Sequence, residues 1–238
     1  MNTEVALPGI RELVRQLRPE LIVSEGAEFA GPLVAESQGI PFVRLHPGAV
    51  HGWGWEGIAA PILAGIRQRL GLAADPSAHE WIDGPQVSFF PAGFDTPSSR
   101  RPQVCRVRPL PPAAAESRDD FVYITFGTEI SGMPFFAAAV AAAVDAALAV
   151  GLRVLVSINN ADPAVIPARD GVTVESWVAQ GEVLPRARAV ICHGGAGTVL
   201  GALTAGTPIL AVPFFADQPF NAERIVQTGI GLRGVART

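Results

Sequence analysis

Short apolar runs alternate with helix-forming segments through the second half of this chain. Each run spans four to six residues, a length that suits a buried strand. Strands that alternate with helices form a parallel sheet, whose ligands bind beyond the carboxyl ends of the strands. The predicted strands are 121–126, 153–157, 172–175, 189–192 and 209–212, and the predicted helices are 134–150, 198–205 and 220–228.

The first half of the chain shows the same alternation less regularly. Its predicted helices are 8–18, 30–38 and 57–70, and its predicted strands are 21–24, 42–45 and 86–90. Between the halves, residues 108–120 are rich in proline and then in polar side chains, which is typical of an interdomain linker. We therefore expect an α/β protein with two doubly wound parallel-sheet domains, 1–107 and 121–238, joined by a linker at 108–120.

The segment 189–221 carries the strongest functional signal in the chain. A predicted strand leads to His193 and a glycine-rich turn, and a helix-forming run begins at Thr198. Backbone N–H groups at such a junction, together with the helix dipole, form an anion site suited to phosphate. Similar turns also occur where a helix merely packs closely on a sheet, and Leu200 stands where a dinucleotide fingerprint needs glycine. The glycines that would let a ligand approach the backbone are Gly194, Gly195 and Gly197.

An acid and an amide, Asp217 and Gln218, follow the next predicted strand. Such a pair can accept and donate hydrogen bonds to vicinal hydroxyls. The alternative is that they cap the helix that begins near Pro219. Phosphate on one loop and hydroxyls on the next indicate a sugar nucleotide as the ligand.

These residues resemble the signature of the GT-B nucleotide-sugar glycosyltransferases of the UDP-glycosyltransferase superfamily, most closely the actinobacterial branch that modifies natural products. Weaker similarity continues through Phe126-Gly127-Thr128 and the stretch 19–41. The signature elements, in order, are Trp177, the HGGAGT run at 193–198, the GTP run at 206–208, Pro213 and Asp217-Gln218.

The resemblance implies two Rossmann-like domains, a donor domain at 121–238 and an acceptor domain at 1–107 that is incomplete. It implies transfer of a sugar from a UDP- or dTDP-sugar to a hydroxyl of an apolar natural product. The transfer would invert the sugar and need no metal or cofactor. We expect a fragment or an unusually short member, whose half at 1–107 has an unpaired sheet edge, weaker protection and a tendency to self-associate.

The resemblance also assigns roles in donor binding. Trp177 would stack on the nucleobase, with Val178 and Gln180 completing the nucleoside pocket, although spacing alone fits a core tryptophan. The diphosphate would be held by His193, the backbone of Gly195 and Gly197, and the Thr198 hydroxyl; Asp217 and Gln218 would bind sugar hydroxyls. Thr128 is either a second phosphate contact or a helix cap. Plant members hold the ribose with a glutamate where this chain has Gly201, which leaves UDP and dTDP both open.

The catalytic part of the signature departs from the family. A histidine base and an orienting carboxylate are expected there; Glu25 matches the carboxylate, but no histidine precedes it. His46 follows a predicted strand and is either a substitute base or a loop histidine, and its spacing to His51 does not indicate a metal site. Without its base the chain could be a nucleotide-sugar binding module or pseudoenzyme, and an epimerase of the same fold is a remoter alternative.

Two tryptophans, Trp53 and Trp55, lie in a glycine-rich segment. They fit an adaptable apolar acceptor pocket, to which His46 could contribute, or a local cap on the core. The net charge of −4 argues against nucleic acid as a partner. We see no signal peptide, and the apolar stretch 135–151 carries Asp145, which favours a buried helix over a membrane span. These features predict a cytoplasmic enzyme.

Overall fold

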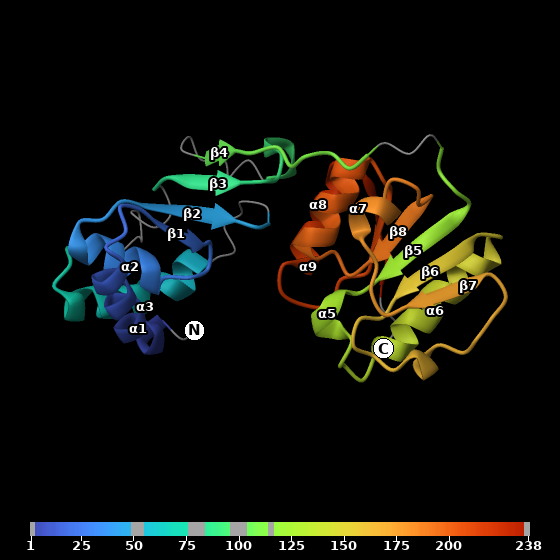
Figure 1. Cartoon of the computed structure of the whole chain (residues 1–238), viewed down its shortest axis with the longest axis horizontal. Coiled ribbons are helices and arrows are strands. Elements are labelled where there is room, and N and C mark those ends of the chain that lie inside the picture. The colour runs from blue at the N-terminus through green and yellow to red at the C-terminus, as the bar shows by residue number, and fades with distance from the viewer. Residues whose placement is uncertain (1–2, 49–54, 76–83, 96–103, 114–116, 236–238) are drawn as a thin grey trace. The chain divides into compact units, whose positions relative to one another are not determined.

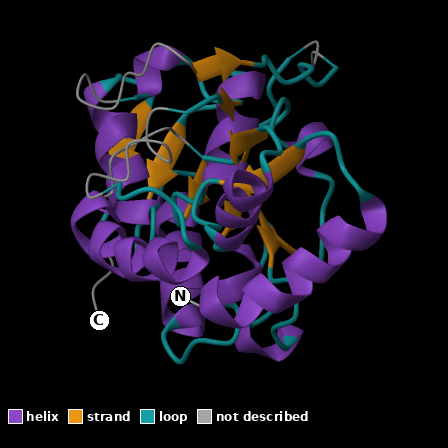
Figure 2. Cartoon of the chain, turned by 90° about the vertical axis from the view of Figure 1, so that its left-hand side faces the viewer, coloured by secondary structure: helices purple, strands orange, loops and turns teal. Residues whose placement is uncertain are grey.

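The computed structural model describes residues 3–48, 55–75, 84–95, 104–113 and 117–235 (Figure 1). The chain divides into two compact units, Met1–Arg108 (unit 1) and Pro109–Thr238 (unit 2). Figure 2 distinguishes the helices and strands by colour. None of the helices in the described ranges is long and apolar enough to cross a membrane.

Unit 1 contains a four-stranded parallel sheet in the order β1-β2-β3-β4. Among the described residues β1 pairs only with β2, and Val23 on this edge strand is 57% exposed. The expected weaker protection and self-association of this half stay predictions. The strands are β1 (Ile22–Glu25), β2 (Phe42–His46), β3 (Gln86–Ser88) and β4 (Val104–Arg106).

The helices of unit 1 are α1 (Thr3–Leu17), α2 (Ala30–Gln38) and α3 (Trp55–Leu70). Figure 1 shows all three on one side of the sheet, as expected for right-handed crossovers that proceed in one direction along the strand order. Their shared core includes Leu7, Val14, Phe29 and Ile66. Helix α1 begins five residues before the predicted start at residue 8, because burial of its apolar stripe across Pro8 compensates for the missing amide.

Unit 2 contains a six-stranded parallel sheet in the order β10-β9-β8-β5-β6-β7. Read from β7, this is the strand order of the dinucleotide-binding Rossmann fold. From β5 the chain continues to β6 on one side, and it later returns to form β8 on the other side of β5. The topological switch point of the sheet therefore lies between β5 and β8. The strands are β5 (Phe121–Thr125), β6 (Arg153–Ser157), β7 (Val172–Glu175), β8 (Ala189–Cys192), β9 (Ile209–Ala211) and β10 (Gly231–Arg233).

Helices cover the two faces of this sheet. Helix α6 (Phe136–Ala149) packs on one face, over alternate apolar residues of β5, β6 and β8 such as Ile124, Val156 and Ile191. Crossovers in the opposite direction place α8 (Ala196–Ala205) and α9 (Gln218–Gln227) on the other face. The predicted α/β class, with two parallel-sheet Rossmann-like domains, is therefore confirmed.

Several boundaries differ from the sequence prediction. Helices α8 and α9 each begin two residues before their predicted starts, at 198 and 220. The end of the expected linker packs on unit 2: Arg118 donates to the carbonyls of Ala187, Ala205 and Gly206, and Asp119 pairs with Arg186. These hydrogen bonds make residues 118–120 part of unit 2.

Candidate functional site

His193 directly follows β8, and its imidazole ring lies between two glycines. A methyl group placed on Gly195 would collide with Nε2 of His193, and one on Gly127 would stand 2.8 Å from Cε1. Only glycine at both positions leaves room for the ring as it stands. Gly127 also has φ +75°, which disfavours any other residue. The loops after β5 and β8 therefore enclose this histidine at the switch point of the sheet.

Burial lowers the pKa of His193 below its ordinary value. The Asp217 carboxylate and the Thr125 carbonyl oppose this shift, and together they do not reverse it. His193 is therefore neutral at pH 7 with a single ring N–H, and its buried Nδ1 has no hydrogen-bond partner in the described ranges. An anionic ligand beside the ring would raise this pKa and favour the charged form.

The N-terminus of α8 lies in the same loop. Gly195 is its N-cap residue, and no side chain in the described ranges caps it. The first N–H groups of α8 are therefore available to an anion, with the helix dipole behind them. A methyl group on Gly197 would meet nothing within 4 Å, so the loop is open on that side. Thr198 lies in the first helical turn and is 7% exposed.

Trp177 lies in the loop after β7 with 72% of its surface exposed. This exposure excludes the alternative of a core tryptophan and leaves the indole face accessible for stacking. Val178 and Gln180 are partly buried, and Gln180 begins the short helix α7 (Gln180–Val183). Nε2 of Gln180 donates to Oγ1 of Thr198 at 3.5 Å. This contact brings the crossover between β7 and β8 next to the glycine loop.

Thr128 is exposed and is the second residue of the short helix α5 (Gly127–Ile130). Phe126 is the N-cap residue, so the helix-cap role considered for Thr128 is wrong. The loop is fixed by Asn159, in the turn after β6, whose Nδ2 donates to the Gly127 carbonyl at 3.0 Å. Asn159 itself has φ +53°, a strained conformation that the sequence did not reveal.

Gln218 points into unit 2 and is 4% exposed. Its Oε1 accepts hydrogen bonds from the backbone N–H groups of Phe214 and Phe215, at 2.9 and 3.1 Å. Asp217 occupies the N-cap position of α9, but its side chain makes no capping bond. Gln218 therefore shapes the loop after β9, and the partly buried Asp217 is the more accessible of the two.

Asn221 is a site residue that sequence reasoning missed. It is fully buried in the first turn of α9 and connects the glycine loop to Asp217 through its amide nitrogen. Ala216, with φ +55°, adds a second strained position just before Asp217. The available signal was the four-residue spacing from Asp217 to Asn221, which places both side chains on one face of a helix.

Gly201 faces the side chain of Leu184. A methyl group there would stand 3.0 Å from Cδ1 of Leu184, so a glutamate at this position would require Leu184 to move. The packing of α7 on α8 thus uses the space next to Gly201.

The candidate catalytic residues lie in unit 1. Oε2 of Glu25 accepts a hydrogen bond from the Ala27 backbone N–H at 2.7 Å. Nε2 of His46 lies 2.8 Å from Oε1 of Gln86 and 3.4 Å from Nη2 of Arg44. The closer partner, an oxygen acceptor, assigns the ring proton to Nε2 and leaves the lone pair on Nδ1. Burial, then the charge of Arg44, lowers the pKa of His46 to about 4, against the hydrogen bond with Gln86. His46 is thus a partly buried strand residue instead of an exposed loop histidine.

Trp53 and His51 lie outside the described residues. Trp55 is the first residue of α3, and the position of its side chain is likewise outside the description. The acceptor role of these tryptophans stays a prediction. Within the described ranges, no three His, Cys, Asp or Glu side chains group as a metal site.

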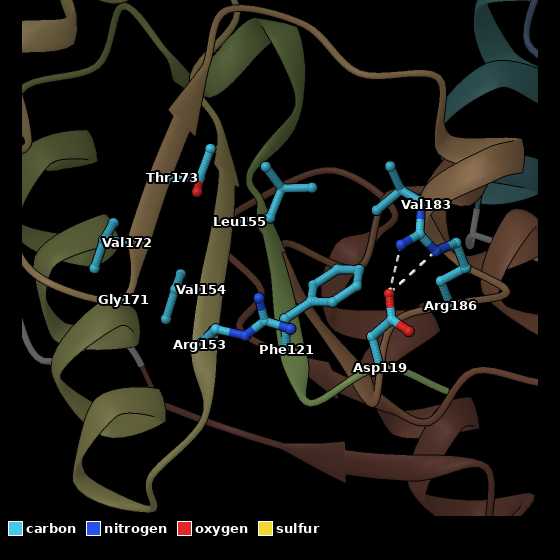
Figure 3. Close-up of a pocket in the computed structure, with 10 residues that line it drawn as sticks. All are labelled: Asp119, Phe121, Arg153, Val154, Leu155, Gly171, Val172, Thr173, Val183 and Arg186. Atoms are coloured by element: carbon cyan, nitrogen blue, oxygen red, sulfur yellow. Dashed lines mark hydrogen bonds and ion pairs between the residues drawn. The ribbon is translucent and has the colours of Figure 1, made fainter. Parts of the chain in front are cut away.

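A pocket of about 350 Å³ opens elsewhere in unit 2, and Figure 3 shows its lining. Phe121, Arg153 and Val172 stand at the starts of β5, β6 and β7, and Arg186 pairs with Asp119 at its rim. It contains none of the predicted site residues. Ligands of parallel sheets bind at the opposite, carboxyl ends of the strands, so this pocket is distinct from the glycine loop.

Unit 2 has the strand order, switch-point loops and open helix N-terminus of a nucleotide-binding Rossmann-like domain. Residues 108–237 match the family model described as "UDP-glucoronosyl and UDP-glucosyl transferase". The chain belongs to this family. Residues 1–70 match the N-terminal domain of erythromycin biosynthesis protein CIII-like proteins.

Known relatives agree with this assignment. The L-demethylnoviosyl transferase of Streptomyces niveus is 32% identical over 232 residues, which are 95% of this chain and 61% of that protein. The calicheamicin glycosyltransferase CalG4 superposes with a TM-score of 0.76 at 27% identity, over 98% of this chain and 65% of CalG4. The spinosyn rhamnosyltransferase SpnG, in complex with thymidine diphosphate, has the same fold (TM-score 0.78, 20% identity, 98% and 64% covered). The chain thus spans about three fifths of the length of these relatives.

Proposed function

We propose that unit 2 binds the nucleoside diphosphate of a sugar donor and that the protein transfers the sugar to a hydroxyl of an apolar natural product. The observation that carries this proposal is the ring of His193, held between Gly127 and Gly195 beside the open N-terminus of α8. A neutral ring N–H and several backbone N–H groups there would donate to the diphosphate. The calicheamicin glycosyltransferase CalG4, which is named for a natural product, supports the acceptor class.

The chemistry follows from where charge develops. As the bond from the sugar to the diphosphate breaks, negative charge grows on the leaving diphosphate. Hydrogen bonds from His193 and the start of α8 would stabilise this charge without a metal ion. Attack by the acceptor hydroxyl from the opposite side of the anomeric carbon would invert the sugar. Trp177, exposed after β7, would stack on the base.

The base of the donor is proposed as thymine or uracil. SpnG binds thymidine diphosphate, which supports dTDP as the donor nucleotide. Gly201 offers no carboxylate to the ribose hydroxyls and packs against Leu184. We therefore expect little discrimination between dTDP and UDP by this position.

The test is calorimetric titration with dTDP and with UDP. Both nucleotides should bind the wild-type chain, and His193→Ala should weaken binding by about 1–3 kcal/mol, the cost of losing a charge-assisted hydrogen bond. His193→Gln, which keeps a neutral donor, should retain part of the affinity. Equal affinities in all three proteins would remove His193 from the site.

A second function, donor binding without turnover, is favoured by the environment of His46. Its pKa of about 4 and its bond to Gln86 make it a weak base toward a hydroxyl. Incubation with dTDP-glucose or UDP-glucose and phenolic or macrolide acceptors separates the two functions. Turnover at ordinary enzyme rates would exclude the binding module.

A further inference from the structure

Asn221 occupies the point where the glycine loop meets the start of α9. Its side chain is fully buried. Nδ2 donates to the Gly194 carbonyl at 2.9 Å and to Oδ2 of Asp217 at 2.8 Å. Because both partners are oxygen acceptors, only the nitrogen of the amide can face them. Oδ1 has no hydrogen-bond partner in the described ranges, so the amide is held by its nitrogen alone.

The backbone around Asn221 leaves the two loops little freedom to move apart. Gly194 has φ +83°, and a methyl group on it would stand 3.3 Å from the Gln218 carbonyl oxygen. The glycine loop is therefore in direct contact with the first turn of α9. On the other side, Oε1 of Gln218 holds the loop after β9 through the N–H groups of Phe214 and Phe215.

The two carboxylate oxygens of Asp217 have different surroundings. Oδ2 accepts from Asn221, whereas no described group bonds to Oδ1. The carboxylate is partly exposed, and its charge acts on His193 by raising the pKa of that ring. One oxygen of Asp217 is thus fixed and the other can accept a hydrogen bond from a ligand hydroxyl.

We propose that Asn221 is a positioning residue that couples the two halves of the donor site. Through one amide nitrogen it fixes the loop that would bind the diphosphate and the carboxylate that would bind the sugar. This inference rests on the proposed function. It follows that a change at Asp217, on the sugar side, alters the binding of a diphosphate that carries no sugar.

The experiment compares Asp217→Ala with Asp217→Asn. Both variants lose the charge of Asp217, but asparagine keeps an oxygen that can accept from Nδ2 of Asn221. Coupling predicts that dTDP, without a sugar, binds Asp217→Ala about three- to tenfold more weakly than Asp217→Asn. In an Asn221→Ala background this difference should vanish. Gln227→Ala, which removes an exposed amide on the same helix, is the control and should bind dTDP as the wild type does.

Hydrogen exchange of the ligand-free proteins provides the second measurement. Amides 194–198 should exchange faster in Asp217→Ala than in Asp217→Asn, while the amides of β5 and β6 exchange equally in both. Equal exchange at 194–198 together with equal dTDP affinity overturns the coupling. If the wild-type chain binds neither dTDP nor UDP, the proposed function fails, and exchange alone decides the coupling. If Asn221→Ala does not fold, the comparison of Asp217→Ala with Asp217→Asn still tests the coupling.

Discussion

Unit 1 and unit 2 each place a histidine at the carboxyl end of a parallel strand, His46 on β2 and His193 after β8. Both rings pack against glycine: a methyl group on Gly26 would stand 2.8 Å from Nδ1 of His46, and Gly127 and Gly195 enclose His193. Burial lowers the pKa of both side chains. Both histidines therefore lie at the carboxyl end of a parallel strand, and both are packed against glycine.

The two rings differ in the charges near them and in the hydrogen-bond partners of their nitrogens. His46 lies near Arg44 and Arg106, and both charges lower its pKa further, while Gln86 takes its ring N–H. The charge near His193 is that of Asp217, which acts in the opposite direction. The Thr125 carbonyl and the glycine backbone adjoin the His193 ring, and its Nδ1 has no hydrogen-bond partner in the described ranges. The proposed role of His193 as a ligand donor therefore requires its single ring N–H to lie on Nε2.

The largest expected effect is a loss of stability at low pH, caused by His46. The pKa of His46 is about 4 in the folded protein and 6.5 in the unfolded chain. Between these values the unfolded chain binds a proton that the folded chain does not, so the free energy of unfolding falls as the pH falls. Above pH 6.5 His46 does not affect the free energy of unfolding. By pH 4 it has lowered the free energy of unfolding by about 3 kcal/mol.

Urea unfolding of the wild type and of His46→Gln at pH 7 and pH 4 measures this loss. Carboxylates titrate in both proteins and cancel in the comparison. The wild type should lose about 3 kcal/mol more than His46→Gln between the two pH values. Equal losses would mean that the pKa of His46 is not lowered in the folded protein.

Glycine substitutions sharpen the comparison further. Gly195→Ala forces the ring of His193 to move and should weaken dTDP binding by about 1–3 kcal/mol, as His193→Ala does. Gly26→Ala displaces His46 from Gln86 and should lower the stability of unit 1 by about 1–3 kcal/mol, with dTDP affinity unchanged. Calorimetry with dTDP and urea unfolding measure the two effects.

Gly132→Ala is the matched control, because a methyl group there meets nothing within 4 Å. It should change neither the affinity for dTDP nor the stability by more than a few tenths of a kcal/mol. A loss of dTDP affinity in Gly26→Ala would contradict the assignment of the two histidines to separate roles.

The sequence predicted most of unit 2 and the centre of its site. Largely apolar runs located β5, β6 and β8, because a strand buried on both faces needs such a run. In the edge strand β7, valines alternate with exposed Thr173 and Glu175. The glycine-rich turn located His193 and the start of α8 to within two residues. The residue types alone indicated phosphate and hydroxyl binding there.

Features created by tertiary contact could not be predicted. Strands β4 and β10 have three residues each and exist through pairing with β3 and β9. In β10, Gly231 lies so close to the Ile209 carbonyl that any side chain would collide. The inward turn of Gln218 and the two bonds of Asn221 depend on loops that are distant in sequence. A local pattern does not specify such partners.

The smallest expected effect is the pH dependence of nucleotide affinity. His193 has a pKa below 6.5 in the free protein, and a bound diphosphate would raise it because negative charge favours the imidazolium. Binding then takes up a proton, so dTDP affinity should rise a few-fold as the pH falls from 8 to 6. Protonation of the diphosphate itself weakens binding in the same range, and titrations of His193→Gln measure that contribution. The wild type relative to this variant should gain affinity toward low pH, whereas His46→Gln should follow the wild type. Parallel curves for the wild type and His193→Gln would show that the ring binds only in its neutral form, as a hydrogen-bond donor without charge.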